Sequence, residues 1–341
     1  MKKALLYGSL IGAGIGFYAL FRNRPETIAI EEELPFDEQG LLKTTTEDIF
    51  LVASDGLPLA LSVVRPAYRP VKAVVQIIHG ILEHRKRYLD FAHHLAENGY
   101  AVVISDNRGH GQSINEQFVL GYMPSTDRMV EDQANITTFI KQRFANKPVY
   151  LYGHSFGSMV ARVYLQEHDA EIDKLLLTGT VQYEKNVKLA CVIAEIANKV
   201  AGEHSFSWIL KKLSDFGSDD KTWLTSNEEH VEKAMNDPWM IPGYDNRGVA
   251  TIWQTNRELK RQVKFACQHP ELPILSITGA EDWDITGGEQ GLLDTENTLR
   301  QIGYRNIDII DLPQMKHEVL NEIENKLVYQ LIVDFFEGSL K

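Results

Sequence analysis

Hydrophobic positions follow two alternating patterns from about residue 47 to the carboxyl end. Short, nearly continuous apolar runs occupy residues 73–78, 101–105, 149–152, 175–177, 274–278 and 307–310. Between these runs, apolar residues recur every three or four positions, as they do at 88–95. Apolar strands that alternate with amphipathic helices are typical of a mostly parallel sheet with helices on both faces. The pattern therefore predicts an α/β fold.

Two further features divide the chain into segments. Strands expected at 49–53 and 59–64 flank the turn Asp55-Gly56 and open the folded region. Residues 183–271 contain helical periods but no convincing strand, which indicates an inserted helical cap. The predicted organisation is an anchor or signal segment at 1–24, a linker at 25–45, a core at 46–182, the cap at 183–271 and the second part of the core at 272–341.

The amino-terminal segment is strongly apolar. Residues 4–21 carry no charge and lie between Lys2 and Lys3 on one side and Arg22 and Arg24 on the other. A helix of that length is ~27 Å long, enough to cross a thin bilayer. We therefore expect a retained single-pass anchor in the cell membrane; a cleaved signal peptide and a buried helix are the alternatives. The flanking charges nearly balance and slightly favour a folded domain outside the cytoplasm.

Three glycines in this segment, Gly8, Gly12 and Gly16, repeat every four residues and would share one face of a helix. Small residues at that spacing let two membrane helices approach closely, so an anchor-mediated homodimer is one interpretation. Glycine is also frequent in membrane spans that form no such contact, which is the alternative interpretation.

Composition and charge exclude several classes of partner. The chain of 341 residues has 35 Lys plus Arg against 47 Asp plus Glu, which gives a net charge of −12 at pH 7. Such a balance, with no local basic patch, opposes binding to nucleic acid. The two cysteines, Cys191 and Cys267, lack the spacing typical of a zinc site or a disulfide framework.

One motif, Gly153-x-Ser155-x-Gly157, lies between an expected strand and an expected helix. In that context it predicts a sharp turn that exposes a nucleophilic serine, Ser155. The glycines fit this prediction, because a Cβ at either position would crowd the turn. The alternative is a serine that only caps the following helix.

A nucleophilic serine needs a histidine base and an acidic residue that orients the base, in the chain order serine, acid, histidine. Among the histidines after Ser155, His317 alone sits in a loop just beyond a late strand. We predict His317 as the base; a surface-loop histidine is the alternative. For the acid, the loop after the strand at 274–278 offers Glu281, Asp282 and Asp284, of which Asp282 is favoured.

The oxyanion formed by serine attack needs preorganised donors. The backbone N–H of Phe156, beside the nucleophile, is one expected donor, and the N–H of Ile81, after the strand at 73–78, is the second. Histidines before residue 111 invite a metal interpretation: His79, His84, His93, His94 and His110. They show no metal-ligand spacing, so no metal site is predicted.

Together these segments resemble the α/β-hydrolase family, and within it the group of monoacylglycerol lipases and lysophospholipases that is also classed with serine aminopeptidases. The similarity covers roughly residues 45–340. It rests on His79-Gly80-Ile81-Leu82-Glu83-His84 with Arg87-Tyr88, on Asp106-Asn107-Arg108-Gly109-His110-Gly111, on Gly153-His154-Ser155-Phe156-Gly157-Ser158, on Gly279 to Asp282, and on His317-Glu318 with Leu320-Asn321-Glu322.

The resemblance implies Ser155 as nucleophile, Asp282 as acid, His317 as base, and the backbone amides of Ile81 and Phe156 as oxyanion donors. It also implies no cofactor, and a cap that shapes a tunnel for an acyl chain. The chain departs from the group at position 82, where a small residue is frequent, and at position 156, where methionine is common; both departures concern the size of the pocket.

The sequence therefore predicts a membrane-tethered serine hydrolase that cleaves carboxylic esters of single-chain lipids, monoacylglycerols or lysophospholipids, through an acyl-enzyme. Its expected partners are an amphiphilic ester substrate and, through the amino-terminal segment, a membrane. One alternative is a peptidase of the aminopeptidase type, which would need an acidic subsite for the substrate amine. The other is a binding protein that keeps the hydrolase fold without catalysis.

Overall fold

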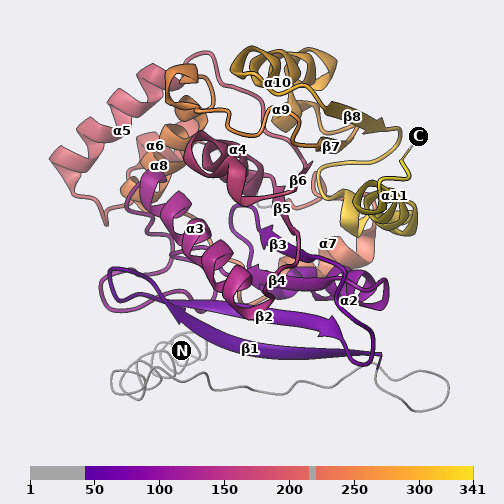
Figure 1. Cartoon of the computed structure of the whole chain (residues 1–341). Helices are drawn as coiled ribbons and strands as arrows, with labels where there is room; N and C mark the ends of the chain where they lie inside the picture. Colours follow the sequence, from indigo (N-terminus) through magenta and orange to yellow (C-terminus); the bar gives the residue numbers. More distant parts are fainter. Residues whose placement is uncertain (1–42, 215–219, 341) are drawn as a thin grey trace.

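Eight strands form one sheet in the computed structural model, which describes residues 43–214 and 220–340 (Figure 1). The strands are β1 (Thr44–Val52), β2 (Pro58–Pro66), β3 (Val74–Ile78), β4 (Ala101–Ser105), β5 (Val149–His154), β6 (Lys174–Thr178), β7 (Ile274–Gly279) and β8 (Ile307–Leu312). Their order is β1-β2-β4-β3-β5-β6-β7-β8. Strands β3 to β8 are parallel, whereas β2 is antiparallel to both β1 and β4. The mostly parallel sheet predicted from the apolar runs is confirmed.

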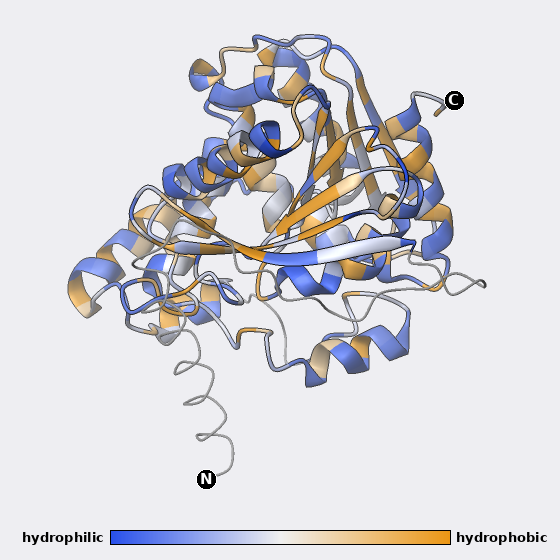
Figure 2. Cartoon of the chain, turned by 60° about the horizontal axis from the view of Figure 1, so that its bottom comes forward, coloured by the Kyte–Doolittle hydropathy of each residue, from blue (hydrophilic) through white to orange (hydrophobic). Residues whose placement is uncertain are grey.

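Helices cover both faces of this sheet. They are α2 (Leu89–Glu97), α3 (Thr126–Arg143), α4 (Phe156–His168), α5 (Val187–Ala201), α6 (Trp208–Ser214), α7 (Glu228–Asn236), α8 (Asn246–Glu258), α9 (Trp283–Thr286), α10 (Gly288–Ile302) and α11 (Asn325–Glu337), with short 3-10 turns at Arg85–Tyr88, Asp169–Glu171, Gln262–Lys264 and Val319–Asn321. In Figure 2 the apolar strands lie among helices whose outer faces are polar.

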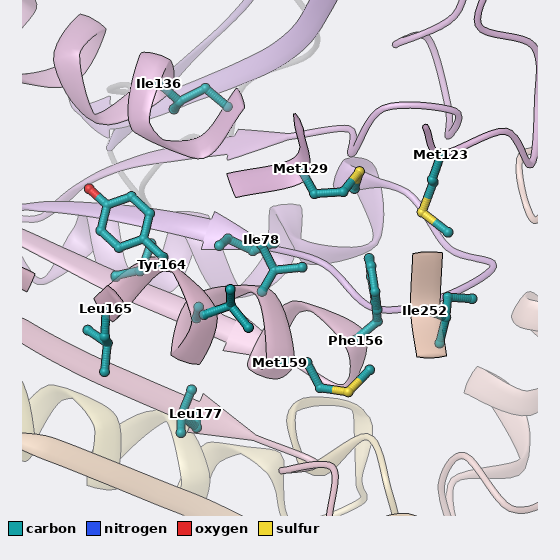
Figure 3. Packing of buried hydrophobic residues seen from close by; sticks show 14 of the residues in the cluster. Ile78, Met123, Met129, Ile136, Phe156, Met159, Tyr164, Leu165, Leu177 and Ile252 are labelled. Carbon is teal, nitrogen blue, oxygen red and sulfur yellow. The ribbon is translucent and has the colours of Figure 1, made fainter. Parts of the chain in front are cut away.

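The central strand β3 shows why the apolar runs are continuous. Val74 and Ile78 belong to a core cluster that includes residues of α3 and α4 (Figure 3). Val75 and Ile77 point the opposite way and belong to a second cluster with residues of α2 and α11. All four side chains are fully buried. A strand that packs against helices on both faces has no polar face, so its sequence does not alternate.

A helical segment, α5 to α8, lies between β6 and β7, and the described residues of this segment, 183–214 and 220–271, contain no strand. Val249 and Ile252 of α8 share the core cluster of Met159 and Val160 of α4 (Figure 3). The segment therefore packs on the helix that follows β5. The limits of a separate cap at 183 and 271 remain a prediction.

Strand β1 begins earlier than the sequence indicates. It starts at Thr44, inside the predicted linker, and pairs with β2 along its whole length. The polar residues Thr44 and Thr46 are buried, and the Thr44 hydroxyl lies 2.7 Å from His93 Nδ1. Buried threonines with a hydrogen-bond partner look like exposed positions in a hydrophobicity pattern, which explains the missed start.

The predicted location in the cell membrane is corrected. Within residues 43–214 and 220–340, no helix is long and apolar enough to cross a membrane. The longest helix there, α3, has 18 residues and includes charged side chains at both ends. Residues 1–24, on which the predicted anchor, its orientation and the contact through Gly8, Gly12 and Gly16 depend, lie outside the described residues. The membrane assignment is not kept.

A buried arginine, Arg108, connects the β1–β2 turn to α3. Arg108 Nη1 lies 2.8 Å from Asp55 Oδ2 in the β1–β2 turn, and its Nη2 lies 2.8 Å from Asp132 Oδ1 in α3. The Arg108 guanidinium also stacks on the ring of Phe118, 4.5 Å from its centroid. The Arg108 side chain is fully buried and joins the buried Asp132 to the partly exposed Asp55.

We expect Arg108→Met to lower the free energy of unfolding by about 3–5 kcal/mol, because it leaves the buried Asp132 without its cation. The control is Arg305→Met, which removes the exposed ion pair of Arg305 with Glu271 and should change stability by less than about 1 kcal/mol. Urea unfolding followed by circular dichroism measures both. Equal effects of the two substitutions would contradict the assigned role of Arg108.

Candidate active site

Ser155 occupies a strained turn between β5 and α4. Its backbone has φ 53° and ψ −119°, a conformation that side-chain-bearing residues rarely adopt. A Cβ at Gly153 would lie 2.3 Å from the carbonyl oxygen of Gly157, and one at Gly157 would lie 2.1 Å from that of Ile78. The Ser155 side chain makes no capping hydrogen bond to α4. Ser155 therefore occupies the N-cap position of α4 without capping the helix through its side chain, and the interpretation as a serine that only caps the helix is wrong.

His317 and Asp282 are joined directly. His317 Nδ1 lies 2.7 Å from Asp282 Oδ2, and both side chains are buried. Asp282 follows β7 and His317 follows β8, so neighbouring parallel strands deliver both groups to one edge of the sheet. Of the other acids considered, Glu281 and Asp284 are both exposed. The structure thus places Asp282 next to His317. Neither of the competing carboxylates, Glu281 and Asp284, pairs with His317.

The environment of His317 fixes its protonation. Burial disfavours the charged imidazole, but the adjacent Asp282 carboxylate outweighs burial and raises the pKa of His317 above its ordinary value. Because Nδ1 donates to Asp282, the Nε2 atom of the neutral ring is an acceptor. The neighbouring His154 ring lies 4.8 Å from that of His317 between centroids, and burial holds the pKa of His154 well below its usual value. His154 is therefore neutral and adds no charge.

Ser155 and His317 line the same pocket. Its walls also include Gly80, Ile81, Leu82, Glu83, His154, Lys221, Trp223, Leu224, Met240 and Glu318. The Trp223 ring lies 5.1 Å from that of His317 between centroids. Within the described residues, no hydrogen bond joins the Ser155 hydroxyl to His317; such bonds are often long until substrate is present. Serine, histidine and the Ile81 loop therefore face one space.

The two residues predicted to supply the oxyanion donors, Phe156 and Ile81, have side chains in different surroundings. The Phe156 side chain is 1% exposed and belongs to the core cluster of Met123 and Met129 (Figure 3), so it does not line the pocket. Ile81 is partly buried and lies directly on the pocket wall. The structure thus brings the Ile81 loop to Ser155, while Phe156 comes there as its chain neighbour.

The segment between α7 and α8 holds the loop that contains Ile81. Leu82, next in the chain, has φ 62°, and its N–H donates to the Tyr244 hydroxyl at 2.7 Å. The Ile241 N–H donates to the Leu82 carbonyl at 2.9 Å. His84 Nε2 lies 2.8 Å from Asp237 Oδ2. Three contacts therefore tie the helical segment between β6 and β7 to the Ile81 loop.

The donors around Tyr244 can be assigned. His110 Nδ1 lies 3.1 Å from the Arg108 carbonyl, so Nδ1 carries the proton of this ring. Burial lowers the pKa of His110 to about 4, which keeps the ring neutral. Its Nε2 atom therefore accepts a hydrogen bond from the Tyr244 hydroxyl at 2.7 Å, and the hydroxyl oxygen accepts from the Leu82 N–H. No sequence pattern predicted this network, because Leu82 and Tyr244 are 162 residues apart.

The histidines considered for a metal have other partners. His79 Nε2 accepts from the Asn107 N–H at 2.8 Å, while His84 and His110 pair as described above. His93 lies beside Thr44. Burial lowers the pKa of His79 to about 3, so this ring is neutral as well. In the described ranges, no group of three or more ligating side chains is placed to hold a metal ion.

A family model described as serine aminopeptidase matches residues 69–324, well over half of the chain. The chain belongs to this family. A similar curated protein is monoglyceride lipase of Rattus norvegicus, 25% identical over 291 residues, with 83% of this chain and 91% of the relative covered. Another is Phospholipase YtpA of Bacillus subtilis, 26% identical over 276 residues, with 77% and 94% covered.

A solved structure shares the fold. It is a thermostable carboxyl esterase from Bacillus coagulans in complex with glycerol, with a TM-score of 0.76 and 22% identity over 87% of this chain and 99% of that chain. The α/β-hydrolase fold and the monoacylglycerol lipase-like group expected from the sequence are therefore confirmed. The protein is an enzyme of the ester-hydrolase type.

We expect Tyr244→Phe to lower the free energy of unfolding by about 1–3 kcal/mol, because it leaves the buried Leu82 N–H without an acceptor. Tyr68→Phe is the matched control, since Tyr68 is 74% exposed. Urea unfolding compares the two variants, and amide hydrogen exchange at Leu82 locates the effect. Unchanged exchange at Leu82 in Tyr244→Phe would show that the hydroxyl does not hold this loop.

Proposed function

We propose that the protein is a serine hydrolase that cleaves carboxylic esters of single-chain lipids, monoacylglycerols or lysophospholipids, through an acyl-enzyme. The observation that carries this proposal is the buried Asp282–His317 pair, which opens onto the same pocket as the strained Ser155. A base with its orienting acid, and a serine hydroxyl that lines the same pocket as the base, are the groups that acyl transfer needs.

The reaction follows from these positions. Ser155 Oγ attacks the ester carbonyl while His317 Nε2 takes its proton, and Asp282 stabilises the imidazolium through Nδ1. The backbone N–H groups of Ile81 and Phe156 donate to the oxyanion. Collapse expels the alcohol, which takes the proton from His317, and leaves the acyl group on Ser155. A water molecule, activated by the same histidine, then releases the fatty acid and restores Ser155.

The pocket favours an ester with an apolar chain. Five apolar side chains contribute to its walls: Ile81, Leu82, Trp223, Leu224 and Met240. Apolar walls of this kind gain free energy by covering hydrocarbon, so an acyl chain is a suitable occupant. Relatives named monoglyceride lipase and phospholipase agree with this class of substrate and leave both headgroups as candidates.

The peptidase alternative receives less support. A subsite for a substrate amine needs an unpaired carboxylate, and the carboxylates of the pocket wall are Glu83 and Glu318. Arg87 pairs with both, at 3.2 Å to Glu83 and 2.6 Å to Glu318. Both carboxylates are therefore already engaged by Arg87, and neither is the unpaired carboxylate that an amine subsite needs.

The proposal is tested by fatty-acid release from monoolein, lysophosphatidylcholine and triolein, and by release of amine from an aminoacyl amide. We expect the wild type to cleave a single-chain ester and Ser155→Ala to lose at least about 10³-fold in kcat, because the nucleophile is absent. The Ser155→Ala protein should keep the wild-type circular dichroism spectrum. Ester cleavage that persists in Ser155→Ala, or cleavage of the amide alone, would contradict the proposal.

The acid is tested by a matched pair of substitutions. Asp282→Asn should lower kcat by roughly 10⁴-fold, since an amide cannot hold His317 in the required tautomer. Asp284→Asn, two residues away and exposed, should leave kcat within about twofold of wild type, as expected for a surface substitution. Steady-state hydrolysis of a soluble p-nitrophenyl ester measures both. The reverse order would assign the acid to Asp284.

The pH profile follows from the raised pKa of His317. The base acts only when it is neutral, so kcat/KM should fall as pH drops through the pKa of His317, with a midpoint above the ordinary value of about 6.5. Removal of the Asp282 charge should move this midpoint down in pH in the residual activity of Asp282→Asn. A midpoint below pH 6 in the wild type would be inconsistent with the buried Asp282–His317 pair.

A further inference from the structure

A buried cluster of polar side chains adjoins the pocket, whose wall includes two of its members, and the proposed reaction uses none of them. The cluster consists of Glu83, Arg87, Tyr88, Glu318 and Asn321. It lies where the β3–α2 connection meets the β8–α11 connection (Figure 1). The first connection contains Ile81 and the second contains His317. The cluster therefore borders both loops that the proposed reaction needs.

Glu83 fixes the first loop at its start. Its Oε1 atom accepts from the Gly80 N–H at 2.5 Å and from the Tyr88 hydroxyl at 2.7 Å. A Cβ at Gly80 would lie 2.8 Å from this Oε1 atom and 2.9 Å from Ser155 Cβ. The Glu83 carboxylate and Ser155 thus pack against the same residue, whose carbonyl carbon is bonded to the N–H group of Ile81.

Glu318 fixes the second loop beside the base. It follows His317 directly, and its own N–H donates to the Leu224 carbonyl at 2.7 Å. Its Oε2 atom accepts from Asn321 Nδ2 at 2.7 Å. The side chain and the backbone of Glu318 are therefore both held, which limits the freedom of the adjacent His317 backbone.

Arg87 connects the two carboxylates. Its Nε lies 3.2 Å from Glu83 Oε2, and its Nη2 lies 2.8 Å and 2.6 Å from the two carboxylate oxygens of Glu318. Its side chain is 9% exposed, and those of Glu83 and Glu318 are 5% and 7% exposed. Bonds from a planar guanidinium restrict direction as well as distance, and burial removes water as a competitor. One rigid group thus sets the separation of two loops.

We propose that Arg87 is a positioning residue that holds the Ile81 loop and the His317 loop in register, through Glu83 and Glu318, so that the oxyanion donor and the base face the same reacting carbon. The inference rests on the proposed serine hydrolase function. It adds the residue that aligns the oxyanion donor in the Ile81 loop with the base in the His317 loop. Arg87 contacts no substrate in this account; it acts through the two carboxylates.

A positioning role differs from a purely structural one in what it changes. If Arg87 only stabilised the fold, its loss would lower stability and leave the turnover of folded molecules intact. If it aligns the two loops, its loss moves the oxyanion donor relative to the base, and a misplacement of ~1 Å costs about 10²-fold in rate. Substrate binding in the apolar pocket should change little, so the effect should lie in kcat and not in KM.

The matched control is Arg108, whose side chain also joins two carboxylates from a buried position but contacts Asp55, Asp132 and Phe118, none of which lines the pocket. We expect Arg87→Lys, in which one ammonium cannot satisfy both carboxylates, to lower kcat for a soluble p-nitrophenyl ester by about 10²-fold, with KM within about twofold. Both variants should lower the midpoint of thermal unfolding by similar amounts. Arg108→Lys, unlike Arg87→Lys, should leave kcat unchanged. Equal losses of kcat in both variants would overturn the proposal.

A second measurement tests the link itself. Glu83→Gln and Glu318→Gln keep the size of each side chain, and their effects on kcat should be strongly non-additive when Arg87 is present. In an Arg87→Met background the same two effects should become additive. If Arg87→Met does not fold, the comparison of Glu83→Gln, Glu318→Gln and the double variant, all with Arg87 present, still decides. Additive effects on kcat in that comparison would overturn the proposal.

The rate at which an alkyl fluorophosphonate labels Ser155 gives an independent readout, because labelling needs both the base and the oxyanion donors. It should fall in Arg87→Lys in proportion to kcat, and an unchanged labelling rate would count against alignment. Wild-type protein that shows no Ser155-dependent turnover would refute the proposed function, and the inference with it. Normal wild-type turnover with normal kcat in Arg87→Lys would refute the inference alone.

Discussion

The close approach of the β5–α4 turn to the end of β3 is the constraint on which the rest of the site depends. The Gly157 Cα packs so tightly against the Ile78 carbonyl that no side chain fits between them, and the same turn places Ser155 in a backbone conformation that needs outside support. Since β3 and β5 are adjacent parallel strands, the loop after Ile78 must pass directly over the serine. The positions of Ile81 and Leu82 follow from this contact.

Parallel strands explain how the remaining groups arrive. Every parallel strand ends at the same edge of the sheet, so the residues after β3, β5, β7 and β8 meet there although they are far apart in sequence. Asp282 and His317 come from neighbouring strands and lie 2.7 Å apart. Two further sets of contacts hold the Ile81 loop: those of Tyr244 from the helical segment, and those of Arg87 from the 3-10 turn before α2. Strand order thus brings the groups together, while these contacts fix their orientation.

Much of the fold and the serine–acid–histidine order could be predicted, because apolar runs and the motif around Ser155 are local signals. The choice of acid was harder, since Glu281, Asp282 and Asp284 differ in burial and hardly in spacing. The contact of Leu82 with Tyr244 could not be predicted, because a hydroxyl acceptor in a helical segment has no pattern of its own. The membrane assignment rested on the hydrophobic length of residues 4–21 alone; these residues lie outside the described part of the chain, whose helices do not support that assignment.

The most direct test of the central claim is covalent labelling of the whole protein with a long-chain alkyl fluorophosphonate, followed by peptide mass spectrometry and measurement of the remaining ester hydrolysis. The account predicts one adduct per molecule, on the peptide that contains Ser155, and loss of hydrolysis in proportion to labelling. Hydrolysis that survives full labelling of Ser155, or an adduct at another residue that abolishes activity, would contradict the assignment of Ser155, Asp282 and His317 as the reacting groups.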